Sequence, residues 1–130
     1  MKIVVSPNPY RDKQFKNARQ ACSILREAGA EVALCLPFDV DKTFEIPHDL
    51  RFQDIQKEIK TADMLICFGG DGTILHSSKI ATEHNLPILG VNIGTMGFIA
   101  ELESGEIELL RRIPKGEYTV EERTMLDVSV

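Results

Sequence analysis

The chain has 130 residues, 43% of them hydrophobic and 27% charged, which are ordinary values for one globular domain with a real core. Its net charge of −5 argues against a broad nucleic-acid-binding surface, because such a surface requires a basic patch. Its longest apolar runs are far shorter than the ~20 residues that cross a bilayer. We therefore expect a domain that binds neither nucleic acid nor a membrane.

The expected elements alternate between short apolar runs and segments of helical periodicity. Strands are expected over residues 2–5, 31–36, 64–68 and 88–91, and helices over 13–28, 50–60 and 73–84, with a further helix that starts at Ser104 as its N-cap. In the helix over 13–28 the apolar positions that recur on one face are Phe15, Ala18, Cys22 and Leu25. In the helix over 73–84 the residues expected to face inward are Ile74, Leu75, Ser78 and Ala81.

Strand–helix alternation with short connections predicts an α/β fold, a doubly wound and mostly parallel sheet with helices on both faces. After Gly116 the pattern changes, because two apparent strands over 118–120 and 125–130 follow with no helix between them. We therefore expect residues 1–116 to form a nucleotide-binding α/β domain. Residues 117–130 are then the first strands of a β-rich second domain, at whose start the chain ends.

The three cysteines are widely spaced and form no CxxC pair, which favours a reducing, cytoplasmic location. Cys22 and Cys67 fall at expected core positions, where a buried thiol is inert. The three histidines follow no metal-binding spacing such as HExxH. The sequence thus predicts no metal site built from protein ligands alone.

Residues 64–73 carry the strongest functional signal, because five apolar residues run directly into the motif Gly-Gly-Asp-Gly-Thr. Asp71 is presented at the carboxyl end of a buried strand, where α/β folds bind ligands. There it can orient a substrate hydroxyl, or accept its proton, for attack on a phosphoryl group. The structural alternative is an ordinary Asp-Gly turn between a strand and a helix.

The neighbouring residues fit a phosphate ligand. Gly69, Gly70 and Gly72 permit close approach of the backbone, and Thr73 lies at a helix start, where free N–H groups attract an anion. A tight turn without a ligand is the alternative, since neither GxGxxG nor a Walker A lysine is present.

The loop over 92–98 follows the next strand and is expected to face the first loop across a cleft. Asn92 offers a paired donor and acceptor, Gly94 allows irregular backbone, and Phe98 can pack on an adenine or nicotinamide ring or fill the core. His76 can reach a phosphate or ribose, or lie at the surface. Arg123 can contact a ligand phosphate, or be an exposed arginine at a strand edge.

The motif at 69–73, followed by Val-Asn-Ile-Gly-Thr-Met-Gly-Phe-Ile-Ala-Glu at 91–101, resembles the NAD kinase (ATP-NAD kinase) family, which usually reads GGDGT and then VNxGxLGFLxE. Met96 stands where leucine is common. Residues 122–126 are similar to the segment that opens the family's second domain. Because GGDGT also occurs in diacylglycerol and sphingosine kinases, the NxGxxGF loop is what separates this family from lipid kinases.

The resemblance implies transfer of a phosphoryl group from ATP, or polyphosphate in some members, to the adenosine 2′-hydroxyl of NAD, giving NADP, with a divalent cation such as Mg²⁺. Asp71 matches the family's proposed general base, and Asp71 and Gly72 match its NAD-contacting pair. Phe98 matches an aromatic near the adenine, and His76 a side chain that contacts NAD. Family members also form homo-oligomers.

Members of this family are roughly twice as long, and the rest of their NAD-contacting residues lie in the second domain. We therefore expect this chain to be an N-terminal piece that is inactive alone. The alternative functions are a lipid kinase catalytic domain of the diacylglycerol kinase type and a non-catalytic nucleotide-binding module.

Overall fold

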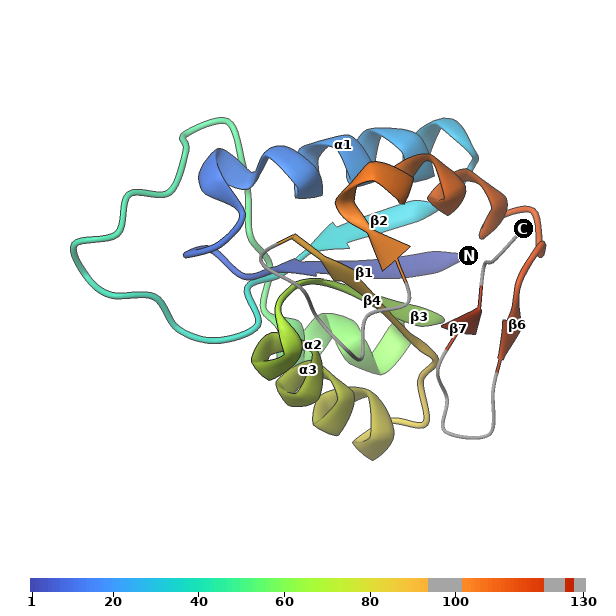
Figure 1. Ribbon diagram of the computed structural model, residues 1–130. Coiled ribbons are helices and arrows are strands. Elements are labelled where there is room, and N and C mark those ends of the chain that lie inside the picture. The colour runs from blue at the N-terminus through green and yellow to red at the C-terminus, as the bar shows by residue number, and fades with distance from the viewer. Residues whose placement is uncertain (94–101, 121–125, 128–130) are drawn as a thin grey trace.

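The computed structural model describes residues 1–93, 102–120 and 126–127, in which a parallel sheet carries helices on both of its faces (Figure 1). The strands of this sheet are β1 (Lys2–Pro7), β2 (Glu31–Leu34), β3 (Met64–Gly69), β4 (Ile88–Asn92) and β5 (Leu102–Glu103). The α-helices are α1 (Lys16–Glu27), α2 (Ile55–Glu58) and α3 (Asp71–Glu83), and the 3-10 helices are η1 (Lys13–Phe15), η2 (Ile59–Thr61) and η3 (Ser104–Arg112). The predicted doubly wound α/β fold is confirmed.

The spatial order of the strands is β2-β1-β3-β4-β5. From β1 the chain first builds outward to β2 and then crosses back to place β3 on the other side of β1, after which β4 and β5 follow in order. The direction of winding therefore reverses between β1 and β3. In open α/β sheets, ligands bind outside the carboxyl ends of the strands at such a reversal.

The sheet is buried on both faces. Alternate residues of β1 show this, because Ile3 and Val5 pack in the core layer under α1 and η3, whereas Val4 packs in the layer under α2 and α3 (Figure 1). The expected inner face of the first helix is confirmed, since the four residues predicted for it, Phe15, Ala18, Cys22 and Leu25, are all buried, Phe15 at the end of η1 and the others in α1.

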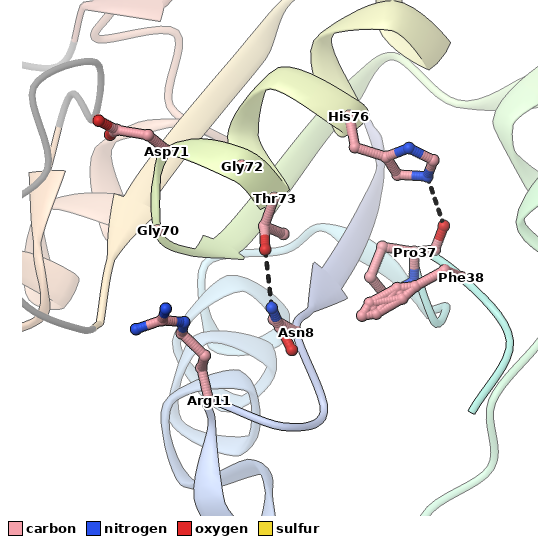
Figure 2. Close-up of a pocket in the computed structure, with 9 residues that line it drawn as sticks. All are labelled: Asn8, Arg11, Pro37, Phe38, Gly70, Asp71, Gly72, Thr73 and His76. Carbon is pink, nitrogen blue, oxygen red and sulfur yellow. Dashed lines mark hydrogen bonds between the residues drawn. The ribbon is translucent and has the colours of Figure 1, made fainter. Parts of the chain in front are cut away.

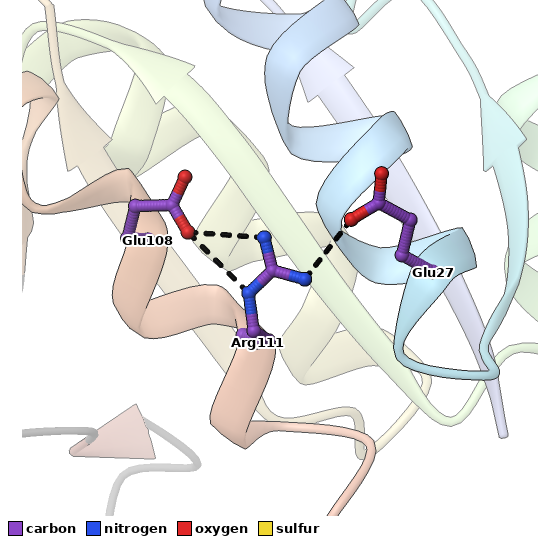
Figure 3. A network of polar contacts seen from close by, with 3 residues as sticks. All are labelled: Glu27, Glu108 and Arg111. Atoms are coloured by element: carbon purple, nitrogen blue, oxygen red, sulfur yellow. Dashed lines mark hydrogen bonds and ion pairs between the residues drawn. The ribbon is translucent and has the colours of Figure 1, made fainter.

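On the outer surface, Arg111 of η3 links its own helix to α1 (Figure 3). Its Nη1 donates to Glu27 Oε2 at 3.0 Å and its Nη2 donates to Glu108 Oε2 at 3.1 Å. These hydrogen bonds, that to Glu27 first, raise the pKa of Arg111. The side chains are solvent-exposed, so the network orients two neighbouring helices rather than holding the core together.

Two predictions about side chains are wrong. Leu75 is 59% exposed, because the face of α3 that packs on the sheet runs through Ile74, Ser77 and Ala81. The N-cap of η3 is Glu103 rather than Ser104, in a capping box with Glu106.

Several element bounds also differ from the predicted ones. The second helical segment is shorter than predicted, because Asp54 caps α2 at Ile55 by accepting from Gln56 N at 3.0 Å. The strand β5 was not predicted. Beyond η3, β6 (Thr119–Val120) and β7 (Leu126–Asp127) pair antiparallel. The domain division at residue 116 stays a prediction. Among the helices of the described ranges, none has the length and apolar character that crossing a membrane requires.

Candidate functional site

The site begins at the turn between β3 and α3. β3 ends at Gly69, Gly70 is the N-cap in an extended conformation, and α3 starts at Asp71 rather than at Thr73 as predicted. A Cβ on Gly69 would lie 2.6 Å from Thr73 Cβ, far inside van der Waals contact. Only glycine therefore lets the helix turn back so closely over the strand end.

The first turn of α3 presents backbone N–H groups that have no partner within the helix, and the positive end of the helix dipole lies there. Asp71 occupies this turn and is half-buried. The glycine at position 72 leaves the space beside the turn open, since a Cβ there would meet nothing within 4 Å. This end of α3 can accept an anion in close contact with backbone.

A pocket of about 350 Å³ lies at this turn, beside the segments that follow β1 and β2 (Figure 2). It is therefore placed at the reversal of winding between β1 and β3. Its lining residues are Asn8, Arg11, Pro37, Phe38, Gly70, Asp71, Gly72, Thr73 and His76. In Figure 2 the Asp71 side chain projects from the side of the turn opposite to His76.

A hydrogen bond fastens the loop after β1 to the helix. Asn8 Nδ2 donates to Thr73 Oγ1 at 2.8 Å, and Asn8 Oδ1 accepts from Tyr10 N at 2.9 Å. Both polar groups of the Asn8 amide are thus used, one toward α3 and one toward its own loop. The pocket wall on the β1 side is held in place by this residue.

His76 borders the pocket from the second turn of α3. Its Nε2 lies 2.9 Å from the carbonyl oxygen of Pro37, to which an Nε2–H donates. The ring of Phe38 lies next to it, with centroids 6.4 Å apart, and also stacks on Tyr10. His76 therefore ties the loop after β2 to α3, and its contact with a ligand stays a prediction.

Asn92 is the last residue of β4 and pairs with Gly69 in the parallel register. The loops after β3 and β4 therefore leave the sheet at the same edge. Asn92 is 3% exposed, and its Nδ2 donates to Glu103 Oε2 at 2.9 Å. Its amide nitrogen thus anchors β4 to the start of η3. Three further predicted site residues, Gly94, Phe98 and Arg123, lie outside the described residues.

The thiols take no part in this site. All three cysteines are buried, and burial raises the pKa of Cys35 and of Cys67 to about 12. No group of three or more His, Cys, Asp or Glu side chains within the described ranges could hold a metal. Mg²⁺ needs only one or two carboxylates when substrate phosphates supply the other ligands. Asp71, the acid that lines the pocket, fits that requirement.

Sequence reasoning missed four residues of the pocket, namely Asn8, Arg11, Pro37 and Phe38. The first two follow β1, and the other two follow β2. The stretch Ser6-Pro7-Asn8-Pro9 predicts a stiff turn after the first strand and does not by itself indicate a ligand contact. The available signal was position, since every segment after a parallel strand lies at the ligand-binding edge. Which of these segments adjoin is set by strand order, which periodicity does not reveal.

A parallel sheet with a glycine-rich turn into a helix, and a pocket at its reversal point, defines a doubly wound α/β domain with a candidate ligand site. The model of the ATP-NAD kinase N-terminal domain matches residues 2–118. The chain belongs to the NAD kinase family.

Curated relatives agree with this assignment. The NAD kinase of Corynebacterium diphtheriae is 32% identical over 133 residues, which cover 99% of this chain and 42% of the relative. That of Methanopyrus kandleri is 37% identical over 114 residues, covering 87% and 39%. That of Natranaerobius thermophilus is 45% identical over 78 residues, covering 59% and 27%. The chain spans less than half the length of these relatives. A solved flavone reductase aligns with a TM-score of only 0.40 and 16% identity, over 85% of this chain and 50% of that one, and has no weight here.

Proposed function

We propose that this chain contributes the catalytic aspartate and the phosphate-binding turn of an NAD kinase, which transfers the γ-phosphoryl group of ATP to the adenosine 2′-hydroxyl of NAD and yields NADP. One observation carries the proposal: the motif at 69–73, part of the resemblance to the family, leads into α3, and its residues 70–73 line a pocket at the reversal point of the sheet. Inorganic polyphosphate is the alternative donor.

In this proposal Asp71 acts on the attacking hydroxyl. Its carboxylate accepts a hydrogen bond from the 2′-OH, orients the oxygen toward phosphorus and takes the proton as the bond to phosphorus forms. A carboxylate is a weak base toward an alcohol, and phosphoryl transfer has a loose transition state. Most of the rate contribution of Asp71 is therefore orientation, with proton transfer late in the step.

The backbone of the turn binds phosphate. The positive end of the helix dipole at the start of α3 attracts the phosphate charge, and the glycines at 70 and 72 place no side chain in its way. A divalent cation that enters with ATP supplies neutralisation of the phosphate charge, and Asp71 is the pocket residue that would hold it. The proposed contacts to the dinucleotide are His76, Asn92, Gly94, Phe98 and Arg123.

We propose that the 130-residue chain alone binds ligand but does not catalyse NADP formation, because the curated relatives are more than twice as long. A reducing, cytoplasmic location and assembly into a homo-oligomer also belong to this proposal. The buried, reduced state of Cys22, Cys35 and Cys67 supports the first of these.

The test follows NADP formation from NAD and Mg²⁺-ATP. It uses the chain by itself and a chimera in which these 130 residues replace the matching segment of the Corynebacterium diphtheriae NAD kinase. We expect no turnover by the chain alone and turnover by the chimera. In the chimera, Asp71→Asn should lower kcat by orders of magnitude with little change in NAD affinity.

Other results select other functions. Turnover that survives Asp71→Asn would leave a nucleotide-binding module in which the aspartate only contacts ribose. Phosphorylation of diacylglycerol in place of NAD would indicate a lipid kinase. NADP formation by the 130-residue chain would refute its inactivity alone.

A further inference from the structure

We propose that Arg11 binds the phosphates of the phosphoryl donor, in the pocket on the β1 side of Asp71. This inference rests on the proposed function and adds to it the side from which the donor enters. It is carried by three features of the described structure: the position of the guanidinium, its lack of any partner, and the open pocket beside it.

Arg11 is held at the pocket by its own backbone. Its N–H donates to the carbonyl oxygen of Asn8 at 3.1 Å, and Asn8 is in turn bonded to Thr73 of α3. The guanidinium carbon lies 4.0 Å from the point where a Cβ would stand on Gly70. Figure 2 shows the side chain reaching from the loop after β1 toward the turn at Gly70.

The Arg11 side chain makes no hydrogen bond or ion pair within the described residues. Two of the other described arginines are paired, Arg19 with Asp49 and Arg111 with two glutamates, and the rest are not. Arg11 differs from those unpaired arginines because it lines the pocket at the Gly70 turn. Arg11 is exposed and borders a pocket of about 350 Å³, within the size range of small-molecule sites. Its donors are available to a ligand.

The charge arrangement calls for an anion. Cations are unfavourable near the N-terminus of a helix, where the dipole is positive. Arg11 therefore does not stabilise α3. Its position beside the Gly70 N-cap is electrostatically unfavourable, and an anion bound between the guanidinium and the helix would remove that repulsion. The planar fork of a guanidinium matches phosphate oxygens in a bidentate manner. Of the described pocket residues, Arg11 is the one with a permanent positive charge.

The two sides of Asp71 differ in structure, and this difference assigns the two substrates to different sides. On the β4 side, Asn92 is buried and bonded to Glu103. On the β1 side lie the pocket and Arg11. A donor whose phosphates occupy the β1 side leaves the β4 side of Asp71 for the hydroxyl of the dinucleotide.

The experiment measures binding of inorganic tripolyphosphate to the 130-residue chain by titration calorimetry, with NAD titrated separately. The variant is Arg11→Gln, and Arg51→Gln is the matched control, an exposed arginine that lies beside a different pocket. We expect Arg11→Gln to weaken tripolyphosphate binding at least tenfold, Arg11→Lys to weaken it less, and Arg51→Gln to change it less than twofold. NAD affinity should stay within twofold in every variant.

Amide chemical shifts of the wild-type chain give a second measurement that needs no variant. Tripolyphosphate should shift the amides of Arg11, Gly70 and Gly72 and leave the β4 end unmoved. Binding unaffected by Arg11→Gln, shifts confined to the β4 side, no tripolyphosphate binding, or an equal loss of NAD affinity would each overturn the proposal. None of these results bears on whether the chimera makes NADP, so the kinase proposal stands or falls separately.

Discussion

Asn8 and Thr73, 65 positions apart in the chain, are joined by a hydrogen bond of 2.8 Å from Nδ2 to Oγ1. The bond connects the loop after β1 to the first turn of α3, the two segments that meet where the winding of the sheet reverses. It thus sets the width of the pocket between them.

Removing the acceptor of this bond should destabilise the fold. Thr73→Val keeps the shape of the side chain, but the Asn8 amide loses its acceptor. We therefore expect the free energy of unfolding, measured in urea, to fall by about 1 kcal/mol. Thr82→Val is the matched control on the same helix, at an exposed position whose side chain makes no hydrogen bond within the described residues, and should lie within about 0.5 kcal/mol of wild type. Equal effects of the two substitutions would contradict a structural role for the bond.

Adding one methyl group at two neighbouring glycines should have opposite effects. Gly69→Ala places a Cβ 2.6 Å from Thr73 Cβ and should lower stability by about 1–3 kcal/mol. Gly72→Ala meets open space inside a helix and should leave stability unchanged or raise it by up to ~1 kcal/mol. Thermal melts of both variants compare them directly, and a stable Gly69→Ala variant would show that the turn can relax.

The buried thiols should make stability fall at high pH. Burial raises the pKa of Cys67 from its ordinary value of 9.0 to about 12, so the folded chain keeps a proton that the unfolded chain releases. Stability is therefore fully present below pH 9 and is lost as pH rises toward 12, by about 1.4 kcal/mol per pH unit for each such thiol.

The test compares slopes of unfolding free energy between pH 9 and 10.5. Cys67→Ala and Cys67→Ser should both show a shallower decline than wild type, whatever their stability at neutral pH. A slope identical to wild type in both variants would mean that this thiol ionises as readily in the folded chain as in the unfolded chain.

The burial of the thiols also predicts their reactivity. Iodoacetamide at pH 8 should modify Cys22, Cys35 and Cys67 in urea but spare them in the native chain.

The ion pair between Arg111 and Glu27 should contribute little and depend on salt. Both side chains are exposed, so solvent and counterions screen their attraction. We expect Glu27→Gln to lower the melting temperature slightly in dilute buffer and not at all in ~1 M NaCl. Glu45→Gln, an exposed control without an ion pair in the described structure, should respond equally at both salt concentrations. A salt-independent loss would point to packing instead.

Much of the fold could be predicted from local pattern, because the spacing of apolar residues within a short segment indicates a strand buried on both faces or a helix buried on one face. The runs at 2–5 and 64–68 are strands, and the stripe from Phe15 to Leu25 faces the core. Leu75 shows the limit of this reasoning. Positions 74 and 75 both suit an inner face, and only the sheet against which α3 packs selects Ile74.

The sequence by itself determined the class of fold, the glycine-rich turn with Asp71 at its tip, and the family resemblance that the comparisons confirm. Tertiary structure alone decided that the pocket opens toward β1 and β2, that Arg11 and Phe38 belong to it, and that the Asn92 amide is bonded to Glu103. The reason is physical. Periodicity and turn chemistry act over a few residues, whereas the order of strands in a sheet depends on packing between segments tens of residues apart.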